Sequence, residues 1–174
     1  MANRHTVIVI VSIIVIAATL GYSSLNVVSA KDLQFRWHQS GSFDLLSIMF
    51  GGKLVACNNS DYPANFAKYS FNVIYDGQSL GTFSTNSGGV LPHTSMMIDG
   101  KFSTDDNRVS QILLASLDTA LGNSEAAARI NVNKVSVITT LDTTVIGIVP
   151  FSITHEYSGQ EFLQMMNQKT RCDK

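Results

Sequence analysis

Residues 54–82 decide the fold, and they read LVACNNSDYPANFAKYSFNVIYDGQSLGT. The segment opens with an apolar run that ends at Cys57, and residues 58–63 follow as a polar corner closed by a proline. Short polar side chains bond their own backbone at such corners, and proline cannot continue a hydrogen-bonded ladder. The chain is therefore predicted to form a strand, turn sharply and begin a second strand.

The residues after the corner alternate between apolar and polar types, which is the period of a half-buried strand. One face of this strand holds Tyr69, Phe71, Val73 and Tyr75. Asp76-Gly77 follows it, and this dipeptide suits a two-residue type I′ turn because both central positions need a positive φ. Residues 78–84 are therefore predicted to fold back as the second strand of a hairpin.

This order of elements resembles the group-2 late embryogenesis abundant proteins, the water-stress-and-hypersensitive-response domain. The likeness rests on an apolar strand that ends in an Asn-initiated corner at Asn58, an aromatic-alternating strand, the Tyr-Asp-Gly turn and the Gly81-Thr82 pair. The family commonly has Asn-Pro at the corner, whereas here Asn59 follows and the proline comes at Pro63. The resemblance implies an all-β sandwich of about seven strands with one helix, usually non-catalytic, often tethered to a membrane and linked to stress protection.

The N-terminal segment has no charged residue between His5 and Lys31, and residues 6–20 are almost entirely Val, Ile and Ala. About 20 apolar residues, at about 1.5 Å each, span the roughly 30 Å hydrocarbon core of a bilayer. The segment is either a membrane anchor or a cleaved signal sequence. A signal-peptidase-like Val-Ser-Ala precedes Lys31, but the apolar stretch exceeds the roughly 7–15 residues of an ordinary signal core, so we favour a retained anchor.

Two further expectations concern this anchor. We expect the N-terminus in the cytoplasm and the domain on the extracytoplasmic side, although Arg4 on one side is opposed by Lys31 and Arg36 on the other. Small residues on neighbouring turns, Ala17, Ala18 and Gly21, allow another helix to approach closely. An ordinary lipid-facing anchor explains the same residues.

The charge of the remaining chain excludes some partners. Without Arg4, the 11 basic and 13 acidic residues give residues 31–174 a net charge of −2. No basic field marks a nucleic-acid surface. The expected partners are the lipid bilayer and, in one hypothesis, other membrane protein subunits. No nucleic acid is expected as a partner, and the sequence identifies no small-molecule substrate.

The two cysteines, Cys57 and Cys172, are too few for a disulfide framework. They form one bridge if the tail returns to the corner, and the alternative is a strand cysteine with a free tail cysteine. Asn58-Asn59-Ser60 is a glycosylation sequon at an expected surface corner, which makes Asn58 a candidate glycosylation site.

The rest of the chain yields further predicted elements. They are a strand at residues 33–37 with Trp37 in the core, a long strand at 43–57 bent at Gly51-Gly52, a strand at 95–102 with a bulge or turn at Asp99-Gly100, a helix from Ser103 or Thr104 to Gly122, two strands at 130–141 and 145–155 joined by a turn at Asp142-Thr143, and a short helix at 160–168. The apolar run at 145–149 is compatible with a buried strand.

No constellation of nucleophile, base and metal ligands emerges from the sequence. The four histidines lie singly, without a second ligand at metal-binding spacing, and no glycine-rich phosphate loop is present. We therefore expect no cofactor, no metal site and no enzymatic activity.

The sequence predicts an all-β protein, an immunoglobulin- or fibronectin-III-like β-sandwich of about seven strands with one α-helix, preceded by one N-terminal transmembrane helix. The expected divisions are an anchor at residues 1–30, the sandwich at 31–160, and a short helix with a polar tail at 161–174. Two functions are expected. One is a membrane-anchored protein that binds or shields under desiccation or osmotic stress, and the other is an accessory subunit of a larger membrane complex.

Overall fold

The computed structural model describes residues 3–45, 47–104, 131–145, 149–169 and 172. Within these ranges, seven strands form one antiparallel sheet in the order β1-β2-β7-β5-β4-β8-β9, and β3 pairs with β6 in a small second sheet. The strands are β1 (Gln34–Trp37), β2 (Gly52–Cys57), β3 (Ala64–Phe66), β4 (Lys68–Tyr75), β5 (Gln78–Thr85), β6 (Gly88–Val90), β7 (Ser95–Ser103), β8 (Val135–Val145) and β9 (Val149–Ser158).

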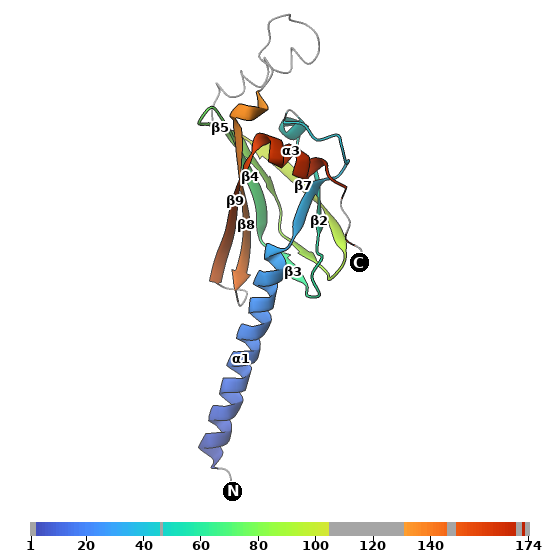
Figure 1. Ribbon diagram of the computed structural model, residues 1–174. Helices are drawn as coiled ribbons and strands as arrows, with labels where there is room; N and C mark the ends of the chain where they lie inside the picture. Colours follow the sequence, from blue (N-terminus) through green and yellow to red (C-terminus); the bar gives the residue numbers. More distant parts are fainter. Residues whose placement is uncertain (1–2, 46, 105–130, 146–148, 170–171, 173–174) are drawn as a thin grey trace, which may run out of the picture.

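Two α-helices flank the sheet within the described part of the chain. The apolar helix α1 (Arg4–Lys31) extends away from one end as a long stem, and α3 (Gly159–Asn167) lies across the other end (Figure 1). The sheet curls around a core whose largest fully buried side chains include Phe71, Phe83 and Phe162. This mostly antiparallel curled sheet, preceded by one apolar helix, confirms the predicted all-β, sandwich-like fold.

The central hairpin follows the sequence prediction. Asp76 and Gly77 have φ values of 49° and 81°, both positive, and Tyr75 pairs with Gln78 across the turn. The predicted inward face of β4 is also confirmed, because Tyr69, Phe71 and Val73 are buried. Local turn chemistry and side-chain alternation therefore agree here with the tertiary packing.

The predicted long strand at 43–57 is wrong over its first half. Residues Ser47–Phe50 form a 3₁₀ helix that buries Ile48, and the strand β2 begins only at Gly52. Gly51 has a φ of 73°, which a residue with a Cβ rarely adopts. The glycine pair therefore marks the start of the strand, and the apolar side chains before it reach the core from a helical turn.

The predicted bulge or turn at Asp99-Gly100 is also wrong, because β7 runs unbroken through it. Gly100 pairs with Gly52 on β2 and with Thr85 on β5. A Cβ atom at Gly100 would lie 2.2 Å from the ring of Phe83. The glycine therefore makes room for a core aromatic.

The predicted turn at Asp142-Thr143 is likewise wrong. The strand β8 continues to Val145, which pairs with Val149 at the start of β9. Thr143 is buried, and its hydroxyl donates to the carbonyl of Asn65 at 2.7 Å. Val149, predicted to lie in a buried strand, is 53% exposed.

The C-terminal helix α3 agrees with the prediction of a helix at 160–168. Ser158 caps it, with a reciprocal capping box between Ser158 and Glu161. Phe162 and Met166 are fully buried in the sheet's core, and the Asn167 side chain bonds the backbone of Phe43 in both directions at 2.8 and 2.9 Å. The helix therefore closes one end of the curled sheet.

The helix predicted between Ser103 or Thr104 and Gly122 falls on residues 105–130, outside the described residues. Ser103 itself ends strand β7.

Candidate functional site

The helix α1 has two parts with different environments. Its N-terminal and central residues are exposed, and only 6% of its most apolar stretch is buried. Near its C-terminal end, Ser29 and Ala30 are completely buried against the sheet. The helix is long and apolar enough to cross a membrane, and its last turns belong to the folded domain.

Asn26 fastens this helix to the sheet. Its side-chain amide donates to the hydroxyl of Thr143 at 3.2 Å and to the carbonyl of Thr144 at 3.5 Å, and its oxygen accepts the backbone N–H of Asn65 at 2.7 Å. The contacts therefore link α1 to β3 and β8. Both the donor and the acceptor of one amide are used, so the helix is held in one rotational position.

Two hydroxyl groups in the exposed part of α1, those of Thr19 and Ser24, are satisfied inside the helix. The Thr19 hydroxyl donates to the carbonyls of Val15 and Ile16, each at 2.9 Å, and the Ser24 hydroxyl donates to Leu20 at 2.8 Å. In hydrocarbon, an unsatisfied polar group costs several kcal/mol. The helix is thus chemically suited to an apolar environment.

The predicted helix-packing residues Ala17, Ala18 and Gly21 are all exposed, and a Cβ atom built on Gly21 would meet nothing within 4 Å. Ala18 lines a groove of about 520 Å³ where α1 meets the sheet. Its lining is Ala18, Thr19, Tyr22, Ser23, Asn26, Asn65 and Thr144. Of the three small residues, only Ala18 lines this groove.

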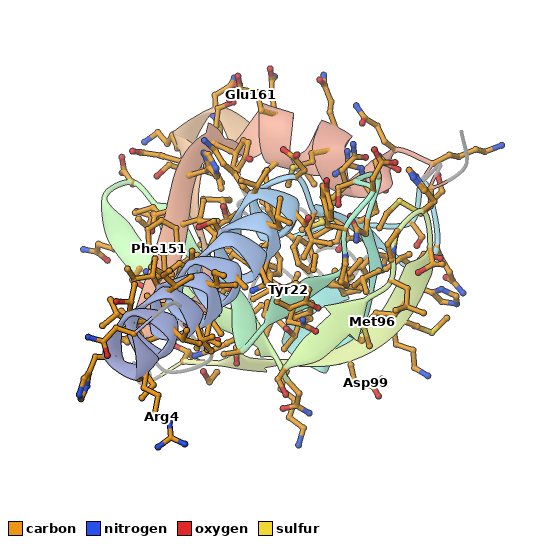
Figure 2. The ribbon with its side chains drawn as sticks, turned by 90° about the horizontal axis from the view of Figure 1, so that it is seen from below. Arg4, Tyr22, Met96, Asp99, Phe151 and Glu161 are labelled. Atoms are coloured by element: carbon orange, nitrogen blue, oxygen red, sulfur yellow. A yellow bond between two sulfur atoms is a disulfide. The ribbon has the colours of Figure 1, made fainter. Side chains whose placement is uncertain are left out.

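Aromatic residues surround the point where α1 leaves the domain. Tyr22 is 66% exposed and shares a small pocket with Tyr62, which is 46% exposed. Viewed from below, Tyr22 and Phe151 lie on opposite sides of α1 (Figure 2). Phe151 is 43% exposed.

The structure joins Cys57 and Cys172 by a disulfide, with a Cα–Cα distance of 5.6 Å. The sequence leaves open a bridge or two separate cysteines, and the structure has the bridge. The C-terminal tail therefore returns to the corner at the end of β2.

The surface position expected for Asn58 is wrong. Its side chain is fully buried, and its amide donates to the carbonyls of Tyr62 at 2.8 Å and Val90 at 3.0 Å. Its oxygen accepts from the backbone and hydroxyl of Ser60 at 3.0 and 2.7 Å. In this structure Asn58 therefore organises the corner, and a glycan on its nitrogen would displace these bonds.

A cavity of about 240 Å³ lies in the seam of the curled sheet. The seam is the gap between β1 and β9, the two edge strands, which are not paired with each other. The end of α1 and the helix α3 also contribute to its wall, and the lining residues are Ala30, Lys31, Leu33, Gln34, Phe35, Arg36, Tyr69, Thr139, Leu141, Ile153, His155, Tyr157 and Met165. We call this space the seam cavity.

Arg36 is the main charged group of the seam cavity. Its guanidinium donates to the carbonyl of Phe35 at 2.8 Å, and makes only long contacts to Gln34 at 3.5 Å and to Gln168 at 3.4 Å. Its Nε is buried with no hydrogen-bond partner, and among the described residues no carboxylate lies within ion-pair distance of it. Burial lowers the pKa of Arg36, an effect that nearby Tyr69 and Tyr157 oppose.

Tyr69 forms part of the cavity wall opposite the seam. It is 5% exposed and its ring stacks on Phe35 with centroids 3.8 Å apart. Burial raises the pKa of the Tyr69 phenol, Tyr157 raises it further, and the Arg36 cation lowers it. The phenol therefore stays neutral and keeps its proton available as a hydrogen-bond donor.

Metal-binding groups do not gather in the described residues, where no set of three or more His, Cys, Asp and Glu side chains is close enough to hold an ion. His93, which has a φ of 53°, lies 2.8 Å from Asp61 on the corner, and His155 lies at the seam. The structure brings no two of the predicted candidate residues together except the two cysteines.

Comparison with known proteins identifies no family. No family model matches the chain, and no curated protein matches it. A solved structure described as "Crystal structure of protein from Archaeoglobus fulgidus" is similar over 72% of this chain and 94% of its own, with 12% identity and a TM-score of 0.32.

Sequence reasoning missed Asn26 and Arg36. A polar amide near the end of an apolar helix is a signal for Asn26, because such a group needs partners. Arg36 carried no signal, since it alternates with Phe35 and Trp37 as an outward residue of an ordinary strand would. Only the curl of the sheet places it beside a cavity.

Proposed function

We propose that this protein is a single-pass membrane protein whose β domain is held in a fixed orientation at the bilayer surface and acts by binding rather than by catalysis. The observation that carries the proposal is the continuity of α1, which runs without a break from exposed apolar turns into turns that Asn26 bonds to two strands. A flexible tether would leave the domain free to rotate relative to the helix, whereas the hydrogen bonds of Asn26 oppose that rotation.

The retained anchor is supported by the surroundings of the alternative cleavage site. The Ser29 and Ala30 residues that would precede the cut are helical and completely buried. Exposed Tyr22 and Tyr62 lie where α1 leaves the domain, and aromatic side chains of this kind favour the membrane–water interface. The N-terminus in the cytoplasm and the domain outside is our proposed orientation, which the Cys57–Cys172 disulfide supports because disulfides persist in oxidising compartments.

The anchor is tested by extracting membranes from cells that make the full chain with alkaline carbonate. We expect the protein in the membrane pellet with an intact mass that includes residues 1–30. A soluble form that starts at Lys31 would contradict the anchor and favour a cleaved signal.

The fixed attachment is tested with Asn26→Ala in the full chain in neutral detergent. The variant removes three hydrogen bonds between α1 and the sheet, so we expect amide hydrogen exchange in β3 and in the last turns of α1 to accelerate by about tenfold, for a loss near 1.4 kcal/mol. Asn133→Ala, at an exposed amide far from the helix, is the control. Equal rates of amide exchange in Asn26→Ala and Asn133→Ala would contradict the fixed attachment of α1 to the sheet.

The biological role that we propose is protection under desiccation or osmotic stress, as the resemblance to the group-2 late embryogenesis abundant proteins implies. The test is survival of a deletion strain after drying or osmotic shock, with the full chain restored as the control. We expect reduced survival that the restored chain corrects. Unchanged survival contradicts the protective role and leaves the anchor untouched.

A second candidate function is that of an accessory subunit, which the groove beside Ala18 and Thr19 favours. A neighbouring membrane helix could pack on the small residues and enter this groove. The mass of the particle extracted in mild detergent separates the two roles. Co-migration with other membrane chains at fixed stoichiometry supports a subunit, and a monomer or small homo-oligomer supports a free-standing protein.

A further inference from the structure

We propose that the seam cavity is a binding site for a small organic carboxylate. This inference is independent of the membrane role and of stress protection, because it rests on the residues that line the seam cavity. It follows from the place of the cavity in the fold, its charge, the polar and apolar groups of its lining, and its size.

The first property is that the cavity interrupts a sheet that otherwise closes over its core. The edge strands β1 and β9 face each other without pairing, and the gap between them is filled by α3 at one end and by the last residues of α1 at the other. Fully buried Phe162 and Met166 of α3 pack the interior beyond the cavity. The space between the edge strands is partly open to solvent, with exposed Lys31 and His155 at its lining, so a small molecule can enter it.

The second property is an uncompensated positive charge. Arg36 has a buried Nε without a partner, and no carboxylate lines the cavity among the described residues. Lys31 and His155 lie exposed on the same lining, and the first adds a second positive charge. A half-buried cation without a counter-ion is costly, and an entering anion removes that cost.

The third property is a set of polar groups that match a carboxylate beside walls that match an apolar tail. A guanidinium binds a carboxylate with two parallel N–H donors, and beyond the bond to the Phe35 carbonyl the terminal nitrogens of Arg36 make only long contacts, to Gln34 and Gln168. Tyr69 and Tyr157 add phenols to the lining. The apolar part of the wall is formed by Leu33, Phe35, Leu141, Ile153 and Met165.

The volume decides between an inorganic anion and an organic one. At about 30 Å³ for each water in the liquid, about 240 Å³ corresponds to roughly eight waters, which is more than a lone chloride or phosphate occupies. The space lies below the roughly 300–1,000 Å³ of drug-sized pockets. A compact monocarboxylate with a short aliphatic or single aromatic group fits both limits.

The test is a nuclear magnetic resonance titration of the full chain in a neutral maltoside detergent at constant ionic strength. The probes are acetate, butyrate and benzoate, with benzamide as the uncharged analogue of benzoate and inorganic phosphate as the inorganic anion. We expect saturable shifts at the backbone amides of β1 and β9, affinity rising from acetate to benzoate, and benzamide weaker than benzoate by about tenfold, which corresponds to about 1.4 kcal/mol.

Two variants place the binding in the seam. Arg36→Met keeps the apolar stem and removes the charge, and it should weaken benzoate binding by about tenfold or more. Lys53→Met makes the same change of charge on the exposed face of β2, where Lys53 is 55% exposed, and should leave binding unchanged. Ile153→Phe fills the cavity without a change of charge, and it should also weaken benzoate binding. It serves as the test variant if Arg36→Met does not fold.

Three results would overturn the proposal. They are no saturable binding by any of the three carboxylates, equal affinity for benzoate and benzamide, and benzoate binding that survives both Arg36→Met and Ile153→Phe. Tighter binding of inorganic phosphate than of every carboxylate would overturn the assignment to an organic anion.

Discussion

Two buried polar regions of this domain differ in how completely their groups are satisfied. At the corner after β2, the Asn58 side chain uses both its donors and its oxygen, and the preceding Cys57 is cross-linked to the tail. At the seam, Arg36 leaves a buried donor unpaired and faces a cavity. Fully satisfied buried networks rigidify a fold, whereas a group left unsatisfied requires another explanation. The corner therefore holds the structure together, and the seam is where binding is to be sought.

The largest expected effect is at the corner's cross-link. Cys172→Ser opens a loop with a sequence separation of 115, and on the chain-entropy account this lowers the free energy of unfolding by about 5 kcal/mol. Urea unfolding of the full chain in detergent, followed by the fluorescence of Trp37, the chain's one tryptophan, measures it. The wild-type chain under a reducing agent should give the same midpoint as the variant. An unchanged midpoint in both would remove the disulfide from the corner's stability.

The next effect is expected from the corner's amide. Asn58→Ala removes the amide that donates to the carbonyls of Tyr62 and Val90 and the oxygen that accepts from Ser60, and we expect a loss of about 2–3 kcal/mol in the free energy of unfolding. The neighbouring exposed residue gives the matched control, since Asn59→Ala should change it by less than about 0.5 kcal/mol. Similar losses in the two variants would mean that the corner does not depend on Asn58.

At the seam the expected sign is different. Arg36→Met removes a half-buried cation whose Nε has no partner, so without added anion the free energy of unfolding should stay within about 0.5 kcal/mol of wild type or rise. The same urea experiment measures it. A loss as large as that of Asn58→Ala would show that Arg36 is a structural group and would cancel the contrast between the two regions.

The smallest expected effect concerns the helix that closes the seam. The backbone N–H and the hydroxyl of Ser158 donate to the Glu161 carboxylate and lower its pKa below the ordinary value of 4.5. Because the folded pKa lies below the unfolded one, the stabilising contribution is complete above pH 4.5 and is lost as the pH falls through the folded pKa.

The check is the slope of thermal stability against pH below pH 4.5, which should flatten in Glu161→Gln. Glu156→Gln, an equal change of charge on the exposed part of β9, is the control. An identical slope in Glu161→Gln and wild type would contradict the role of the capping box.

The elements that sequence reasoning predicted correctly are those whose signal is local. The positive φ values at Asp76 and Gly77 follow from the turn type, and the inward face of β4 follows from alternation. The apolar composition of α1 likewise predicts a helix that is long and apolar enough to cross a membrane. Each of these depends on neighbours within a few residues, so no knowledge of the distant chain is needed.

The errors occurred where a glycine or a polar pair was interpreted without its distant partner. Gly100 suggested a turn, but it lies in an unbroken strand because the ring of Phe83 occupies the space of its missing side chain. Thr143 also suggested a turn, but it is buried and bonded to Asn65 and Asn26. These partners are far away in sequence, and their effect cannot be read from local composition.

The sequence by itself determined the all-β class, the apolar N-terminal helix, the central hairpin and the C-terminal helix, because hydrophobic period and turn chemistry act within a few residues. Only the tertiary structure decided that Cys57 meets Cys172, that Asn58 is buried, and that Arg36 lines a cavity. The reason is that each depends on a partner far away in sequence: the tail returns to Cys57, Val90 accepts from Asn58, and the edge strand β9 lies across the seam from Arg36. Such partners are brought together only by the packing of the whole domain.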